Sequence, residues 1–355
     1  MADPPADTPA FRRWALPRAV RTAGQADWTQ RRLRGSLILL PTIVLCLIWG
    51  GWRHDPEGGV MAAGGAVSVG FGAFQNLGRR RALPMGVMLL AMAGATFLGS
   101  TVHRHGWPLD VGTAVLAGWA FGLITTLGQG AWWVGLQGII GLLAFGAIPA
   151  DVPEAARHGG MIVLGGLVQL AAVYAYWTIS PPPGEPQAVL RRAWLYALVR
   201  NASPRTAGGR HALRVALALG GGAALHYVLG LTHGYWVPMT AAILLKPDFH
   251  ETFARGVGRL GGTLVGAGLA TLLAAVVRPG HLMLAVWLTI AIWACFALQK
   301  VNYALYAVCI TAYVVFSLAS AGLPEPATAL ARVEATLLGA AMAVVAHAVP
   351  LGRKT

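Results

Sequence analysis

The stretch HLMLAVWLTIAIWACFAL, residues 281–298, decides the fold class of this chain. It contains no Asp, Glu, Lys or Arg, and as a helix it would be about 27 Å long, close to the roughly 30 Å of a bilayer core. Similar stretches recur along the 355 residues, of which 56% are hydrophobic and 11% charged. This composition predicts an all-α integral membrane protein and excludes a disordered chain, a basic nucleic-acid-binding domain and an ordinary soluble enzyme.

Twelve apolar stretches read as transmembrane helices. They cover residues 36–53, 58–77, 82–102, 109–128, 130–148, 156–179, 211–231, 234–247, 256–277, 281–298, 302–321 and 328–349. We expect two six-helix membrane halves, 36–180 and 211–350, joined by a cytoplasmic linker at 181–210. Residues 1–35 form a basic arm without the apolar core of a signal peptide, and residues 351–355 form a tail.

The basic residues are distributed unevenly between the predicted loops. With the N-terminus inside, 22 of the 27 Lys and Arg residues fall on the cytoplasmic side and 5 on the outside. Because Lys and Arg are enriched in cytoplasmic loops, this distribution predicts that both termini are cytoplasmic.

A short pattern, R-x-x-x-T-L-x-G-A, occurs twice, at residues 259–267 and 332–340. The first copy opens a span that enters from the cytoplasm, and the second opens a span that enters from outside, which suggests an inverted repeat. Residues 146–166 also resemble residues 320–340, with Arg157 aligned to Arg332. We therefore expect an internal repeat.

The span at 234–247 is unusually short. From Tyr235 to Lys246 a helix would measure about 18 Å, and Pro238 and Gly234 interrupt it. Short spans broken by Gly or Pro are typical of transporter binding sites. The span at 58–77 contains no Leu or Ile up to Phe74; for both spans, tight packing without a pore role is the alternative.

The same region carries a family pattern. HGYWVPMTAAILLKPDF at 233–249 runs into RGVGRLGGTLVGA at 255–267. This segment resembles the fusaric acid resistance (FUSC) family, and is similar to the plant aluminium-activated malate transporters. The resemblance implies a bacterial-type inner-membrane transporter that exports small organic anions, above all aromatic carboxylic acids. It also implies a periplasmic adaptor protein as a partner, and a homo-oligomer stays open.

Seven residues are candidates for substrate binding and two for proton coupling. The first group is Tyr235, Trp236, Lys246, Arg255, Arg259, Thr263 and Arg332; the second is Glu334 and Asp248. Arginine holds a carboxylate in a fork geometry, and an aromatic pair stacks on an aromatic ring. The structural alternatives are arginines that reach lipid headgroups, a structural ion pair at Glu334, and a solvated loop at Lys246 and Asp248.

We expect no enzyme, cofactor, metal site or nucleic-acid partner. The sequence has no G-x-x-x-x-G-K-[ST] loop, so an ion gradient is the expected energy source. Its three cysteines, Cys46, Cys295 and Cys309, sit in apolar runs without metal spacing. Membrane lipid is the expected surrounding partner. Two other functions stay open: a passive organic-anion channel, which would show no proton dependence, and a non-transporting membrane scaffold, which would lack convergent arginines.

Overall fold

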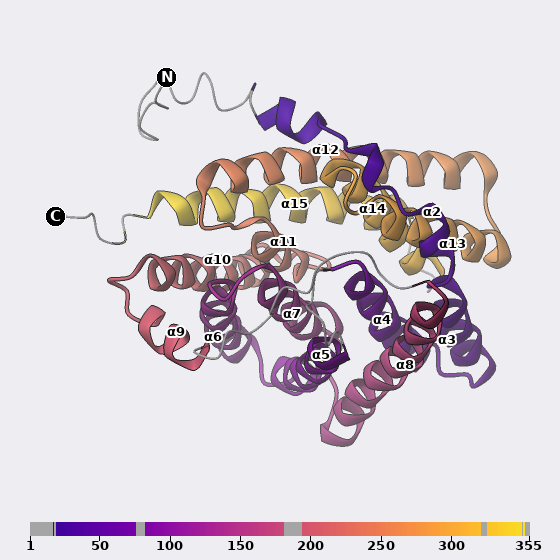
Figure 1. Cartoon of the computed structure of the whole chain (residues 1–355), viewed down its shortest axis with the longest axis horizontal. Coiled ribbons are helices and arrows are strands. Elements are labelled where there is room, and N and C mark those ends of the chain that lie inside the picture. Colours follow the sequence, from indigo (N-terminus) through magenta and orange to yellow (C-terminus); the bar gives the residue numbers. More distant parts are fainter. Residues whose placement is uncertain are drawn as a thin grey trace. The chain divides into compact units, whose positions relative to one another are not determined.

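The computed structural model describes residues 17, 19–75, 82–180, 194–320, 325–349 and 351, and they contain helices and connecting turns but no strand. Residues 1–16 and 18 of the basic arm, the Arg79, Arg80 and Arg81 cluster, the start of the linker and most of the tail lie outside the described residues. The elements are η1 (Trp28–Gln30), α2 (Leu33–Leu37), α3 (Leu40–Trp52), α4 (Pro56–Ala73), α5 (Ala82–His103), α6 (Trp107–Thr125), α7 (Gln129–Ile140), η2 (Gly141–Phe145), α8 (Val152–Ile179), α9 (Trp194–Asn201), α10 (Ala207–Leu229), α11 (Trp236–Leu244), α12 (Phe249–Val277), α13 (His281–Leu298), α14 (Tyr303–Ser320) and α15 (Glu325–Ala348) (Figure 1).

The predicted all-α membrane fold is confirmed. Within the described residues, eight helices are long and apolar enough to cross a membrane: α2 with α3, α5, α6, α8, α10, α12, α14 and α15. The other four predicted spans correspond to α4, to α7 with η2, to α11 and to α13. Of these, α11 has nine residues, so it is about 14 Å long, well short of a bilayer core.

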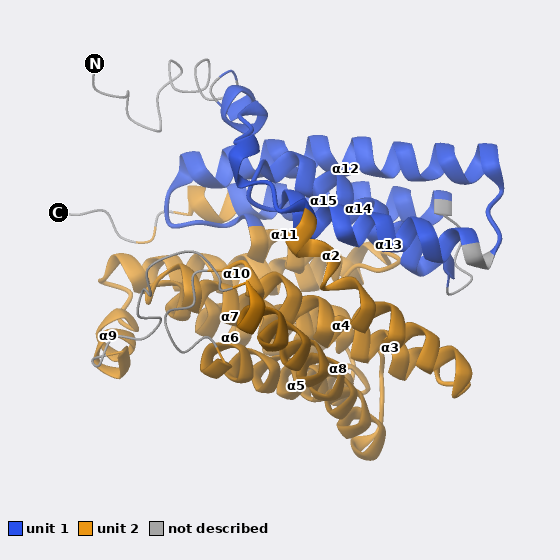
Figure 2. Cartoon of the chain, turned by 45° about the vertical axis from the view of Figure 1, so that its right-hand side comes forward, with its two compact units in different colours: residues 1–33, 244–344 blue, residues 34–243, 345–355 orange. Residues whose placement is uncertain are grey.

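Contacts divide the chain into two compact units, drawn in different colours in Figure 2. Unit 1 comprises residues 1–33 and 244–344, and unit 2 comprises residues 34–243 and 345–355. The boundary between the two units, at residues 243/244, falls within the predicted second membrane half. Helix α10 of that half belongs to unit 2, because it packs along α6. The two-half organisation and the internal repeat stay predictions.

In unit 2, helices α4 and α8 pack backbone to backbone. Fourteen of the 18 residues of α4 are buried. A Cβ added at Gly65 would lie 2.0 Å from the carbonyl oxygen of Ile162, and one at Gly165 would lie 2.0 Å from that of Ala62. Small residues allow such close approach, so packing accounts for the Gly- and Ala-rich composition of α4.

In unit 1, helix α12 packs on α14 through a second set of glycines. A Cβ at Gly262 would lie 2.4 Å from the carbonyl oxygen of Ala304, and one at Gly266 would lie 2.5 Å from that of Val308. The described part of the basic arm docks on the turn before α14: Asp27 N donates to Val301 O at 2.9 Å. Both segments are predicted to be cytoplasmic, so the contact is consistent with the predicted topology.

Candidate functional site

Two arginines of the repeated pattern are buried in unit 1. Arg259 on α12 and Arg332 on α15 are each 2% exposed. The buried side of α12 also contains Thr263, Gly266 and Ala270, because residues three or four apart share one helical face. The Arg, Thr and Gly of the repeated pattern therefore share the protein-facing side of the helix.

The two copies of the pattern meet at their threonines. Thr336 Oγ1 lies 3.4 Å from Thr263 Oγ1, and it donates to its own helix at Arg332 O over 2.7 Å. Helices α12 and α15 run in opposite directions in Figure 1. Each arginine precedes its threonine by four residues, about 6 Å along the axis, so the two arginines lie on opposite sides of the threonine contact.

Among the described residues, no carboxylate pairs with the guanidinium group of Arg259. Its Nε is buried, and no residue of the described chain accepts a hydrogen bond from it. A buried cation without a counter-ion is costly, so this arrangement suits an anionic ligand that would supply the missing charge.

Three further predicted site residues lie at the start of α12 and before it. Arg255 places its guanidinium carbon 5.2 Å from the centre of the Tyr303 ring, a cation–π contact. Asp248 is the N-cap of α12 and accepts from Glu251 N at 2.9 Å. Lys246 is 6% exposed, and its backbone N–H donates to Thr252 Oγ1 at 2.8 Å. Asp248 therefore has a structural role in this arrangement.

Glu334 points away from the arginine centre. It lies on the exposed side of α15, two residues after the buried Arg332. Residues two apart on a helix face different directions, so Glu334 is not placed beside Arg332 or Arg259.

Unit 2 contains a separate cavity of about 270 Å³, which Tyr235 lines. Trp236 is buried at 3% exposure but does not line it, and Lys246 belongs to unit 1. The lining includes no residue of α4 and consists of Gly99, Val102, His103, Asp110, Thr113, Ala114, Leu142, Leu143, Gly146, Ala147, Ala223, His226, Tyr227, His233, Gly234, Tyr235 and Pro238. Of the candidates Tyr235, Trp236 and Lys246, the lining of this cavity includes Tyr235 alone.

One polar group dominates this cavity. Asp110 at the start of α6 lies 2.6 Å from His103 Nδ1, measured from its Oδ2, and the same oxygen accepts a hydrogen bond from the Tyr227 hydroxyl. The three residues come from α5, α6 and α10. Neither Asp110 nor Tyr227 was among the residues singled out from the sequence. A lone Asp two residues into an apolar span was the available signal, because such a residue is costly without partners.

The turn before α11 is built from aromatic contacts. His233 has a positive φ of 55° and stacks on Trp236 with ring centroids 5.0 Å apart. Burial lowers the pKa of His233. A Cβ at Gly234 would collide with the His226 ring, so glycine is required here. The Tyr235–Trp236 pair therefore follows a turn in which the His233 ring packs against both aromatic rings.

Helices able to cross a membrane, together with buried arginines between them, define a multi-pass membrane protein. Residues 217–346 match the family model described as fusaric acid resistance protein-like. The resemblance seen in the sequence is thus confirmed for this region, which contains α11, α12 and α15 and both arginines. The similarity to plant malate transporters stays a prediction.

Three curated relatives match part of the chain. The inner membrane protein YccS of Escherichia coli is 36% identical over 154 residues, which is 42% of this chain and 20% of the relative. The uncharacterized protein slr1298 of Synechocystis sp. is 32% identical over 137 residues, 38% of this chain and 18% of the relative. The uncharacterized protein ORF2 of Neisseria gonorrhoeae is 28% identical over 135 residues, 38% of this chain and 32% of the relative.

The chain spans about a fifth to a third of the length of these relatives. No solved structure matches it at a significant level.

Proposed function

We propose that this protein is an inner-membrane transporter that exports organic anions, with aromatic carboxylic acids as the favoured substrates, and that an ion gradient drives it. Support comes from the family of residues 217–346 and from the name of the relative YccS, an inner membrane protein. A periplasmic adaptor and a homo-oligomer stay predictions.

One observation carries the proposal: the arginine centre of unit 1. Arg259 is 2% exposed, its Nε is unpaired within the described chain, and Thr263 links its helix to the helix of Arg332. A carboxylate would accept two parallel hydrogen bonds from one guanidinium fork. In this proposal Arg259 receives the anion from the cytoplasmic side, and Arg332 takes it over on the other side of the threonine contact.

For the coupling ion, the polar group His103, Asp110 and Tyr227 is the strongest candidate in unit 2. A carboxylate that shares a cavity with an imidazole and a phenol can exchange a proton with either one. Glu334 and Asp248 are weaker candidates, because the first lies on the exposed side of α15 and the second caps α12. We therefore assign proton exchange to the Asp110 group.

The topology proposed from the charge distribution places both termini in the cytoplasm. Contacts within each unit are consistent with the predicted sides of the loops. The arm meets the turn before α14, both predicted inside, and Arg157 meets Asp55, both predicted outside. Reporter fusions at residues 5, 195 and 355 should all report cytoplasm, and a periplasmic signal at any of them would contradict the topology.

The experiment that tests the function is flux in proteoliposomes. Purified protein is reconstituted, and a panel of aromatic and aliphatic carboxylates is measured with and without a pH gradient. Gradient-dependent flux with preference for aromatic acids supports the proposal. Flux that ignores the gradient favours a passive organic-anion channel, and no flux of any carboxylate by folded protein favours the scaffold.

A further inference from the structure

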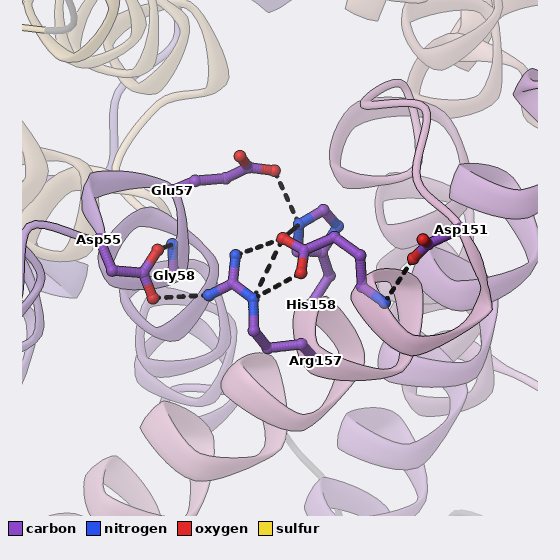
Figure 3. Close-up of polar contacts among 7 residues, drawn as sticks. Asp55, Glu57, Gly58, Asp151, Arg157 and His158 are labelled. Atoms are coloured by element: carbon purple, nitrogen blue, oxygen red, sulfur yellow. Dashed lines mark hydrogen bonds and ion pairs between the residues drawn. The ribbon is translucent and has the colours of Figure 1, made fainter.

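A second cluster of charged side chains, independent of both sites above, lies where α4 and α8 begin in unit 2 (Figure 3). Glu57 comes from the first turn of α4, and Glu154 and His158 come from the first two turns of α8. One ligand atom from each of these three residues lies within 4.8 Å of the others. In the predicted topology this end of both helices faces the outside.

His158 is the unusual member of the cluster. Its side chain is 0% exposed, and neither ring nitrogen has a hydrogen-bond partner in the described chain. Its Nε2 nevertheless lies 2.7 Å from Glu57 Oε1 and 3.3 Å from Glu154 Oε1. The buried imidazole is therefore aimed at two carboxylate oxygens at ion-pair distance.

The two separations from His158 match those of neighbouring ligands around one metal ion. A hydrogen bond needs the acceptor on the N–H axis, whereas two ligands of one ion sit off that axis. With metal–ligand distances of about 2.0–2.2 Å, adjacent ligand atoms in a tetrahedral or octahedral shell are about 3 Å apart. The distances of 2.7 and 3.3 Å bracket that separation.

The charge of the cluster also favours a cation. Asp55, Glu57 and Glu154 carry three negative charges against the single positive charge of Arg157 when the imidazole is neutral. The positive helix ends of α4 and α8 are offset by their N-caps, since Asp55 accepts from Gly58 N and Asp151 from Glu154 N. A divalent cation would balance the remaining two charges.

Arg157 forms ion pairs with two carboxylates of this cluster. It contacts both oxygens of Glu154, at 2.6–3.1 Å, and reaches Asp55 Oδ2 at 2.5 Å. Such a partner fixes the orientation of a ligating carboxylate, as outer-shell groups do at metal sites. It also competes with the metal for Glu154, so we expect micromolar rather than nanomolar affinity.

We propose that Glu57, Glu154 and His158 bind a divalent transition-metal ion of the zinc type. An imidazole together with carboxylates suits Zn²⁺ better than Mg²⁺ or Ca²⁺, which prefer oxygen ligands alone. Three protein ligands leave a fourth position open to water. The ion would bridge α4 and α8 beside their glycine contact. The spacing of residues in the sequence does not predict this site, because 97 positions separate Glu57 from Glu154.

The test is metal binding to the full-length protein in detergent, purified without a polyhistidine tag. Co²⁺, a spectroscopic substitute for Zn²⁺, is titrated and followed by visible absorption, and bound Zn²⁺ is counted by mass spectrometry after desalting. We expect one ion per chain. His158→Gln and Glu57→Gln should each weaken binding at least tenfold. The matched control is His105→Gln, an exposed histidine in the same unit, which should bind as the wild type does.

Three outcomes would overturn the proposal. The first is wild-type protein that binds no stoichiometric ion, which would make the cluster an ion-pair network with a protonated His158. The second is unchanged binding in both variants. The third is thiolate absorption with Co²⁺, which would place the metal on a cysteine. If His158→Gln does not fold, Glu57→Gln still decides, because that side chain is 39% exposed and tolerates replacement.

Discussion

Helix α8 in unit 2 and helix α12 in unit 1 each pack through glycines against a neighbouring helix, α4 and α14 respectively, and each carries an arginine. Arg157 of α8 is satisfied: it is paired with Glu154 and with Asp55. Arg259 of α12 is more deeply buried, and its Nε has no acceptor in the described chain. Arg157, which is paired with carboxylates, therefore stabilises the fold. Arg259, whose Nε has no acceptor in the described chain, is available to bind a ligand.

The comparison has a consequence for the predicted repeat, which aligns Arg157 with Arg332. Arg157 is partly exposed, with 35% of its side chain accessible, whereas Arg332 is 2% exposed. If the two are equivalent by descent, the neighbours of each arginine have diverged. Such neighbours, more than the arginine itself, distinguish a structural ion pair from a binding group.

The largest effect is expected for Gly165→Val. Its Cβ would lie 2.0 Å from the carbonyl oxygen of Ala62, and backbone atoms cannot move aside as a side chain can. Overpacking costs about 1–3 kcal/mol where the structure adapts and more where it does not. We expect loss of folded protein, measured by size-exclusion fluorescence. Gly160→Val is the control on the same helix, because its Cβ meets nothing within 4 Å; equal yields of the two variants would contradict the close α4–α8 contact.

The second prediction addresses the unpaired arginine. Arg259→Gln should reduce carboxylate flux about 10–100-fold, because hydrogen bonds to charged groups contribute about 1.5–3 kcal/mol. Arg259→Lys should restore it only in part, since a point charge replaces a fork. Arg278→Gln removes the same charge from the exposed C-terminal end of α12 and should leave flux unchanged. Normal flux in well-folded Arg259→Gln would assign the arginine to packing, like Arg157 in the comparison.

The third prediction concerns the cavity of unit 2. Asp110→Asn keeps the shape of the side chain but removes the charge that His103 and Tyr227 contact. We expect flux of the favoured carboxylate to lose its dependence on the pH gradient, while binding of the anion changes less than threefold. If carboxylate flux through Asp110→Asn still depends on the pH gradient, Asp110 is not the proton-coupling residue.

The fourth prediction concerns the contribution of the paired Arg157 to the free energy of unfolding. Arg157→Gln, studied in metal-free buffer, should lower the free energy of unfolding by about 1 kcal/mol, because the ion pairs are partly exposed. In thermal unfolding this corresponds to a few degrees. Carboxylate flux should stay near that of the wild type. A tenfold loss of flux would show that Arg157 too serves the substrate.

The smallest effect is expected for Thr263→Val, which keeps the side-chain volume and removes the weak contact to Thr336 at 3.4 Å. Hydrogen bonds between transmembrane helices contribute about 0.6 kcal/mol on average. We expect a shift of the unfolding midpoint near the limit of detection and flux within about threefold of the wild type. A collapse of flux would mean that the hydroxyl itself contacts the anion.

The sequence by itself determined the class of the fold. Long apolar runs predict membrane helices because the bilayer leaves few other solutions for the backbone, and eight helices of the described chain are long and apolar enough to span it. The repeated pattern also places Arg259, Thr263 and Gly266 on one helical face, and the structure shows that this face is buried. The family pattern at 233–267 falls within the matched region 217–346.

Tertiary structure decided which charged groups meet. The contacts of Arg157 with Asp55, of Asp110 with Tyr227 and of Thr263 with Thr336 join residues 73–117 positions apart. No local period encodes such pairs, because they depend on how helices pack and on which helix lies beside which. For the same reason the sequence predicts Arg255, Arg259 and Arg332 equally as binding residues. Only the packing shows that Arg255 contacts the ring of Tyr303, and that the Nε of Arg259 has no acceptor in the described chain.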